Sequence, residues 1–177
     1  MSSSIRNAER ERYGAGMPEA RPVELRRRDR VKQLGNLANL STPFGLAVAR
    51  LGHAKLRPGP RGLLLADGYR LPFPVASAFT VGNVVLTSGS WDRHRPGLLE
   101  HEERHSWQWF WWAGLPFLPA YGVCMAWSVL RTGDRAAEHF FERRAGLLLG
   151  GYRELPVRPL GPALRAALGR RGPRSRS

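Results

Sequence analysis

Three residues near the middle of the chain, His101, Glu102 and His105, form the pattern H-E-x-x-H. On a helix, two histidines four positions apart differ by about 40° around the axis and ~6 Å along it. Both imidazoles can therefore bind one metal ion, and zinc accepts histidine nitrogens at about 2.0–2.1 Å. Glu102 lies on the adjacent flank, where it can take a proton from a water molecule held at the metal. The pattern predicts a Zn²⁺ site with Glu102 as the catalytic base.

A catalytic zinc ion needs a third protein ligand besides the two histidines. The next predicted helix offers three candidates, Glu138, His139 and Glu142. We favour Glu142 as the metal ligand because the small residues Ala145 and Gly146 follow it on the same face. Small residues there would let this helix approach the helix of the H-E-x-x-H pattern closely. Glu138, one turn earlier, is a candidate to hydrogen-bond the outer nitrogen of a ligand histidine.

Two other features of the site stay open at the level of sequence. The residues between the two histidines, Glu103 and Arg104, are charged, whereas the zincin helices that this pattern resembles usually carry no strong charge there. They either pair with neighbours on a solvent-facing surface or mark a degenerate site. Several residues are candidates to stabilise an oxyanion, and the sequence does not choose among them: Tyr121, His139, Arg143 and Tyr152.

A short sheet is predicted ahead of the H-E-x-x-H pattern. Between Arg61 and Ser88, short β-prone runs alternate with turn residues, which predicts two to four strands. Asp67-Gly68 is a hairpin signal, and a further turn is expected at Val81-Gly82-Asn83. Upstream, a helix is expected over Phe44–Leu51, with Ser41 or Thr42 as its N-cap.

The stretch from Leu98 to Gly151 is predicted to be helical with two breaks, at 115–119 and 131–133. Asp134 is placed to cap the third helix, which would end at Gly150-Gly151. The expected fold class is therefore α+β. A short antiparallel sheet would be followed by three helices in a minimal zincin-like architecture.

The stretch from Ser106 to Leu130 carries no charged residue and most of the tryptophans. Its length satisfies the threshold for a transmembrane helix. Pro116 and Pro119 would break such a helix in the middle, and His105 would place a metal ligand at one end. We therefore expect two helices, His101–Gly114 and Pro119–Leu130, that pack in the core. Some of the tryptophans are candidates for exposure at a membrane interface.

The net charge of +14 belongs mainly to the ends of the chain. We expect a basic, mostly disordered segment over 1–33, with a short helix through Val23–Leu34, a zincin-like domain over 34–157 and an arginine-rich disordered tail over 158–177. The ends could contact anionic lipid headgroups. No nucleic-acid-binding module is recognised, so nucleic acid is not an expected partner. The start of the chain lacks a signal-peptide pattern, which predicts a cytoplasmic protein. A peripheral position at the inner face of the membrane stays open, because of the tryptophans and the basic ends.

The pattern resembles that of the gluzincin metallopeptidases, in which H-E-x-x-H is followed by a helix carrying E-x-x-A-[D/G]. Glu142-Arg143-Arg144-Ala145-Gly146 fits this second element. The stretch from Phe79 to Tyr152 is similar to small bacterial proteins related to minimal gluzincins, through FTVGNVVL, HEERHSWQWF, GLPFLPAY and FFERRAG. In that family a glutamine lies three residues past the second histidine, as Gln108 does here. The resemblance implies a short sheet before the motif helix and a zinc-dependent peptidase activity.

Together these observations predict a zinc-dependent hydrolase, most plausibly a peptidase acting on a peptide or protein substrate. The alternative is a catalytically inactive zincin-like domain that binds a membrane surface or a protein partner. The single cysteine, Cys124, excludes an internal disulfide and a cysteine-based zinc cluster.

Overall fold

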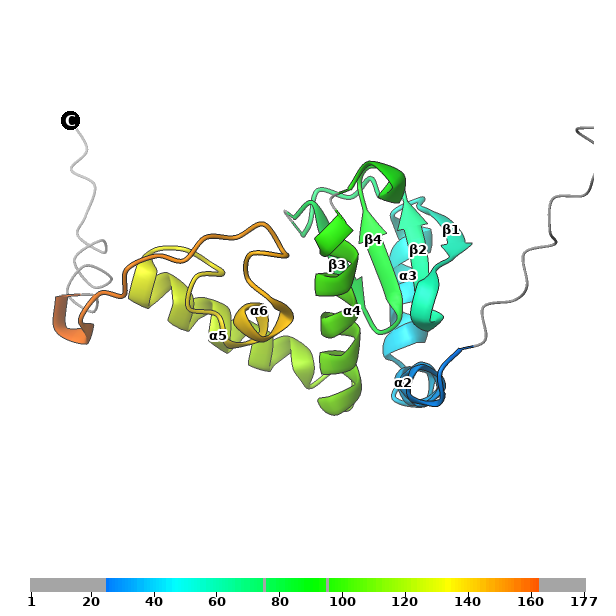
Figure 1. The fold of residues 1–177 in the computed structure, drawn as a ribbon, viewed down its shortest axis with the longest axis horizontal. Helices are drawn as coiled ribbons and strands as arrows, with labels where there is room; N and C mark the ends of the chain where they lie inside the picture. Colours follow the sequence, from blue (N-terminus) through cyan, green and yellow to red (C-terminus); the bar gives the residue numbers. More distant parts are fainter. Residues whose placement is uncertain (1–24, 75, 95, 163–177) are drawn as a thin grey trace, which may run out of the picture.

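The computed structural model describes residues 25–162, except 75 and 95. The described elements are α2 (Arg27–Ala38), α3 (Ser41–Leu51), β1 (Lys55–Pro58), η1 (Pro60–Gly62), β2 (Leu64–Asp67), β3 (Ala78–Val81), β4 (Val84–Thr87), η2 (Trp91–Arg93), α4 (Pro96–Trp111), α5 (Phe117–Thr132) and α6 (Phe140–Ala145). Helix α3 packs on β3 and β4, the long helix α4 runs along β3, and α2 contacts both α3 and α4. Helices α5 and α6 lie on the other side of α4 from the sheet (Figure 1). The predicted α+β class, a short sheet followed by three helices, is confirmed.

The sheet is mixed rather than wholly antiparallel as predicted. Its strand order is β1-β2-β4-β3, and the pairing of β2 with β4 is parallel. Gly82, with φ 61°, turns β3 back onto β4, as the turn signal predicted. The signal at Asp67-Gly68 does not make a hairpin, because the chain leaves the sheet there and returns as the edge strand β3. Strand β4 is buried at all four positions, which suits a central strand with neighbours on both sides.

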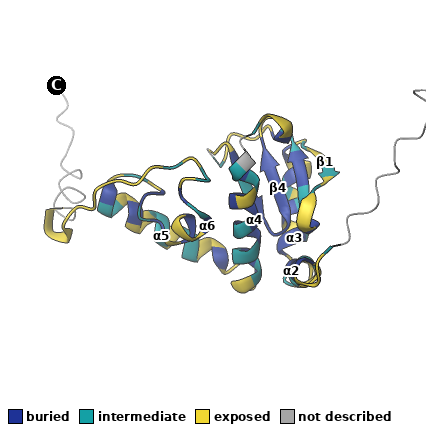
Figure 2. Ribbon diagram, viewed as in Figure 1, coloured by how far each residue is buried: buried dark blue, intermediate teal, exposed yellow. Residues whose placement is uncertain are grey.

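Alternate residues of β4 pack into two apolar clusters, as the period of a strand requires. Val84 and Leu86 belong to one cluster, whose other buried members are Ala49, Ala66, Tyr69, Val81, Trp109, Phe117 and Phe141. Val85 belongs to the other, with Leu63, Leu65, Ala78, Trp91 and Leu98. Helix α4 contributes to both clusters and packs along β3, and the buried residues gather where it meets the sheet (Figure 2). The helix that carries the H-E-x-x-H pattern is thereby fixed to the sheet.

The N-terminal helices differ in detail from the prediction. Helix α2 begins at Arg27, before the expected domain boundary at residue 34, because its buried polar residues bind the rest of the domain. Ser41 and Thr42 lie inside α3 and do not cap it; the N-cap position is Leu40, with φ 66°. Most of the predicted N-terminal segment, 1–24, and part of the predicted tail, 163–177, lie outside the described residues.

The uncharged stretch after His105 forms the end of α4 and most of α5, as two helices rather than one. Its Trp109 and Phe117 are buried in the core, whereas the side chain of Trp111 is 74% exposed. Among the described residues, no helix has the length and apolarity needed to cross a bilayer.

The third predicted helix is shorter than expected, because α6 covers only Phe140–Ala145. Asp134 caps a turn before it, where its Oδ1 accepts hydrogen bonds from the backbone N–H groups of Ala136 and Ala137 at 2.8 and 2.9 Å. The N-cap of α6 is His139.

Candidate metal centre

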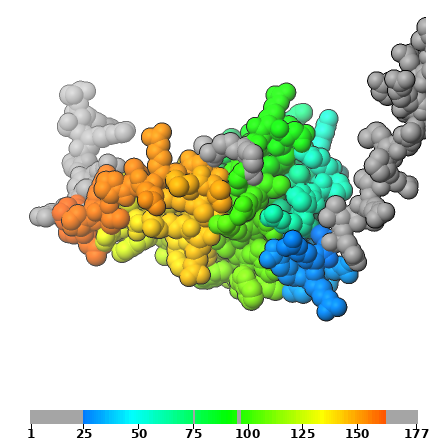
Figure 3. Space-filling view, in the orientation of Figure 1, coloured from blue at the N-terminus to red at the C-terminus, as the bar shows by residue number. Residues whose placement is uncertain are grey.

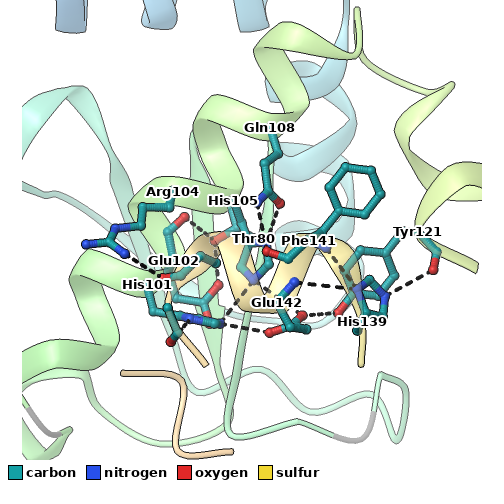
Figure 4. Close-up of polar contacts among 12 residues, drawn as sticks. Thr80, His101, Glu102, Arg104, His105, Gln108, Tyr121, His139, Phe141 and Glu142 are labelled. Carbon is teal, nitrogen blue, oxygen red and sulfur yellow. Dashed lines mark hydrogen bonds and ion pairs between the residues drawn. The ribbon is translucent and has the colours of Figure 1, made fainter. Parts of the chain in front are cut away.

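Helices α4 and α6 bring the three predicted ligands, His101, His105 and Glu142, to one point (Figure 4). The Nε2 atoms of the two histidines are 3.0 Å apart. Glu142 Oε2 lies 3.1 Å from His101 Nε2, and Glu142 Oε1 lies 3.4 Å from His105 Nε2. All three residues are buried, each less than a tenth exposed. They can hold a metal ion.

The separations match those of a tetrahedral ion site. Ligand atoms at about 2.0–2.1 Å from a tetrahedral zinc ion lie roughly 3.4 Å from one another. The three separations of 3.0 to 3.4 Å agree with this value to within a few tenths of an ångström. One ion could bind all three side chains with only small rotations about their side-chain bonds.

The outer nitrogens of both histidines are held by acceptors. His101 Nδ1 lies 3.1 Å from the carbonyl oxygen of Gly146, and His105 Nδ1 lies 2.8 Å from Gln108 Oε1. The Gln108 amide is oriented by its own Nε2, which donates to the carbonyl of Phe141 at 2.9 Å. Because both partners can only accept, each Nδ1 must carry the hydrogen. The neutral imidazoles are therefore the tautomers with hydrogen on Nδ1, and their Nε2 lone pairs face Glu142. Metal ligation through Nε2 requires this tautomer.

Electrostatically, the cluster needs a positive charge. Among the described residues, Glu142 Oε2 is a buried oxygen that accepts no hydrogen bond, although His101 lies close to it. Burial would lower the pKa of His105, but the hydrogen bond and charge of Glu142 outweigh burial and raise that pKa to about 9. Burial would raise the pKa of Glu142, but the two imidazoles hold it well below its ordinary range. Either a proton or a metal cation satisfies two facing imidazoles and a carboxylate.

Glu142 is oriented by residues of α5 and by the cap of its own helix. The Tyr121 hydroxyl donates a hydrogen bond to Glu142 Oε1. His139 Nδ1 accepts from the backbone N–H groups of Phe141 and Glu142 at 3.2 and 3.5 Å, and its Nε2 donates to the carbonyl of Tyr121 at 3.1 Å. Burial lowers the pKa of His139, which keeps the ring neutral as the cap requires. His139, considered as a ligand or oxyanion donor from sequence, has both nitrogens engaged in placing Glu142.

Glu102 lies on the flank of α4 that faces β3. Its Oε2 accepts a hydrogen bond of 2.7 Å from the hydroxyl of Thr80, and the carboxyl group is almost fully buried. Burial raises the pKa of Glu102 even though the histidines and Thr80 lower it. A carboxylate with a raised pKa is a stronger base than an exposed one.

The charged residues between the histidines hold α4 in place on two sides. Glu103 points away from the site, where its carboxylate binds Arg61 and lies 3.7 Å from Lys32 Nζ. Arg104 donates to the carbonyl of Ala145 at 3.3 Å, at the end of α6. These charges therefore attach the motif helix to α2 and to α6, and they do not enter the ligand cluster.

Glu138 does not have the role expected for it. Its carboxylate accepts a hydrogen bond of 3.0 Å from Arg143, whose guanidinium also donates to the carbonyl of Ala137. The outer nitrogens of the ligand histidines are bound by Gly146 and Gln108 instead. The helix that was expected to carry Glu138 begins only after it, so this residue lies outside α6.

The chain after α6 covers the cluster. Gly150 lies so close to His101 that a Cβ atom there would be 2.6 Å from the ring's Cε1 and 2.8 Å from its Nε2. The ring of Tyr152 has its centre 6.0 Å from that of His101, and burial raises the pKa of its hydroxyl. In the space-filling view this segment lies directly against α4 (Figure 3). Of the four oxyanion candidates, His139 and Arg143 are engaged elsewhere, and Tyr121 already donates its hydroxyl hydrogen to Glu142. Tyr152 is the remaining candidate beside the cluster.

Two residues that support the site were missed from the sequence, Thr80 and Gly146. Thr80 sits in an ordinary β-prone run, and nothing local indicates that it orients a carboxylate 22 positions later. Gly146 acts through its backbone carbonyl, which no side-chain pattern reports. Gln108 was noted only through the family resemblance.

Comparison of the chain with protein-family models, with curated proteins and with solved structures gives no match.

Proposed function

We propose that this protein is a zinc-dependent hydrolase, with peptides or proteins as substrates. The observation that carries the proposal is the convergence of His101, His105 and Glu142, with both imidazoles held as tautomers that turn their Nε2 lone pairs inward. The likeness to gluzincins, which rests on H-E-x-x-H and E-R-R-A-G, belongs to the same proposal. Two histidines and one carboxylate are also the protein ligands of catalytic zinc in thermolysin-type sites.

Zinc is the metal that this donor set favours. Neutral imidazoles with a single carboxylate suit a borderline metal, whereas magnesium and calcium prefer sites made of oxygen atoms alone. A bound zinc ion would supply Lewis-acid chemistry, polarising a scissile carbonyl and lowering the pKa of a water molecule toward ~7.

In this proposal Glu102 is the proton carrier of the reaction. It takes the proton of the attacking water and delivers it to the leaving amine, and Thr80 keeps its carboxylate in place. Tyr152, which flanks the cluster, is the candidate to donate a hydrogen bond to the developing oxyanion. Tyr121 could do so only by giving up its hydrogen bond to Glu142.

Elemental analysis of the purified protein tests the metal assignment. About one zinc per chain is expected in the wild type, and loss of that zinc in His105→Ala. His94→Ala is the matched control, because His94 bonds Thr87 outside the cluster and should leave the zinc content unchanged. Equal zinc in wild type and His105→Ala would reject the ligand assignment.

Hydrolysis of a mixed peptide library tests the catalytic assignment. Glu102→Gln should keep its zinc and lose activity by at least ~100-fold, since a general base contributes about 10²–10⁴ in rate. Glu100→Gln is the control, because Glu100 lies on the same helix but pairs with Arg104 on the surface. Unchanged activity in Glu102→Gln would remove Glu102 from the mechanism.

A second candidate is a domain in which the metal is purely structural. The burial of all three ligands and of Glu102 favours it, because a structural site needs no access for a substrate. This candidate predicts that zinc binds and stabilises the fold while no peptide is cleaved, in the wild type as in Glu102→Gln.

A further inference from the structure

Helix α2 has its polar side inward and its apolar side outward. Asp29, Lys32 and Asn36 are buried against the domain. Val31, Leu34 and Leu37 point outward and are 54%, 64% and 51% exposed. A surface helix ordinarily buries its apolar stripe and exposes its polar one. The reversed arrangement of α2 leaves a stripe of aliphatic side chains in contact with water. Because these side chains do not pack in the core, their exposure needs a different explanation.

The apolar stripe continues onto the end of α4. Gly35 of α2 packs on the ring of Phe110, and Gly114 packs against the backbone of Asn39, so the two segments touch. Figure 3 shows the side chains of α2 and those of the end of α4 next to each other. We define the apolar patch by its six exposed members, Val31, Leu34, Leu37, Leu40, Trp111 and Leu115. Contiguous exposed apolar surface of this kind marks a site of interaction.

A group of arginines borders the patch at the start of α2. Arg26, Arg27, Arg28 and Arg30 are all exposed. The acidic residue among them, Asp29, is buried. The partner should therefore present negative charge beside an apolar region. A second copy of this chain would bring more arginines to the interface instead of the anions that they require.

We propose that this face of the protein binds the surface of a lipid bilayer that carries anionic headgroups. The apolar patch would enter the boundary between headgroups and acyl chains, with Trp111 at the level that tryptophan prefers. The arginines at the start of α2 would lie at the lipid phosphates. The described helices are too short or too polar to span a bilayer, so this contact is peripheral.

Sedimentation of the full chain with vesicles tests this proposal. The vesicles are phosphatidylcholine mixed with phosphatidylglycerol, compared with phosphatidylcholine alone. Wild type should bind the anionic vesicles, and Leu34→Gln with Leu37→Gln should weaken binding about tenfold. Val123→Gln with Trp127→Gln, which alters equally exposed apolar residues of α5 outside the patch, should bind like wild type.

A second pair of variants tests how much the arginines at the start of α2 contribute to vesicle binding. Arg27→Gln with Arg30→Gln should weaken binding about fivefold for each arginine removed. Arg50→Gln with Arg70→Gln removes two exposed arginines elsewhere and should have a smaller effect. The arginine-rich ends of the chain are identical in all variants, so the differences report this face alone.

Equal binding of wild type and the α2 variants would overturn the proposal, as would equal binding to neutral and anionic vesicles. A dimer in solution that dissociates in Leu34→Gln with Leu37→Gln, without vesicle binding, would also overturn it and assign the apolar patch to a second copy. Circular dichroism of each variant checks that it is folded, which is expected because all the altered side chains are exposed.

Discussion

The two sides of α4 both carry buried polar side chains, but they satisfy them in different ways. On the side facing α2, Asn83 Oδ1 accepts hydrogen bonds of 2.9 Å from Asn36 and from Ser106. The amide of Asn83 donates to Thr42 and to the backbone carbonyl of Gln33. On the side facing α6, two imidazole nitrogens and a carboxylate converge. The Tyr121 hydroxyl donates to Glu142 Oε1, whereas Glu142 Oε2 faces the imidazole of His101 and accepts no hydrogen bond from the described residues.

This difference separates a structural polar cluster from a group that can hold a metal ion. In the first cluster each acceptor faces a donor of the same chain, so the network is complete when the protein folds. In the second, three acceptors face one another in a low-dielectric interior, which is costly unless a cation joins them. The cluster around Asn83 and the cluster around Glu142 are alike in burial and polarity, and the balance of donors and acceptors distinguishes them.

Zinc should therefore stabilise the protein strongly, and only through the α6 side. At a zinc concentration about a thousand times the dissociation constant, binding contributes ~4 kcal/mol to the free energy of unfolding. For a chain of this size the melting temperature rises on the order of 10 °C. Thermal unfolding with zinc and with a chelator measures this shift. A similar shift in His105→Ala would mean that the stabilising ion binds elsewhere.

Breaking the complete network should destabilise the fold without affecting the metal. Asn83→Leu removes four hydrogen bonds, including the acceptor of the Ser106 hydroxyl and one of the acceptors of the Asn36 amide, so the free energy of unfolding should fall by about 3 kcal/mol. Chemical denaturation measures this loss. Zinc per folded chain should be unchanged; its loss would show that the two sides of α4 are coupled.

Removing a support of one ligand should weaken zinc binding by an intermediate amount. Gln108→Ala deletes the acceptor of His105 Nδ1, and loss of such a partner typically costs 10–100-fold in metal affinity. Competition with a chromophoric chelator measures the affinity. Glu138→Ala is the control, since its carboxylate binds Arg143 and should leave the affinity unchanged. A loss of zinc affinity in Glu138→Ala, with none in Gln108→Ala, would assign to Glu138 the hydrogen bond to a ligand histidine that the sequence suggested.

The proton on His105 should compete with zinc. The pKa of His105 in the folded, metal-free protein is raised from 6.5 to about 9. The protonated pair with Glu142 thus stabilises the metal-free fold below about 6.5, and this stability is lost as pH rises through about 9. Zinc must displace the proton, so its apparent affinity should rise about tenfold for each pH unit up to about 9. A plateau beginning near 6.5 would show that His105 has an ordinary pKa.

Local patterns predicted most of the elements. The β-prone stretch between Arg61 and Ser88 contains the strands β2, β3 and β4, and Pro116 and Gly133 mark the ends of helices as expected. Strand β1 was missed because Lys55–Pro58 is short, lies at an edge and ends in proline. The parallel pairing of β2 with β4 was not predictable either, because strand register depends on contacts between distant segments.

The grouping of His101, His105 and Glu142 was predictable because it rests on local patterns, two histidines one helical turn apart and a carboxylate beside small residues. The partners of these residues are distant in sequence. Glu103 looked anomalous within the H-E-x-x-H pattern until Lys32 and Arg61 were found behind it. His139 looked like a ligand by type, and only the backbone geometry of α6 reveals it as a cap.

The position of α5 and α6 on the far side of α4 from the sheet has a consequence for local unfolding. This C-terminal unit meets the rest of the domain mainly through α4, and Glu142 is its contribution to the ligand cluster. A metal ion bound there would link two cooperative units of unequal stability, the unit of α5 and α6 and the unit of α4 and the sheet. Without the ion, the amide hydrogens of α5 and α6 should exchange with solvent through a partial opening that leaves the sheet intact.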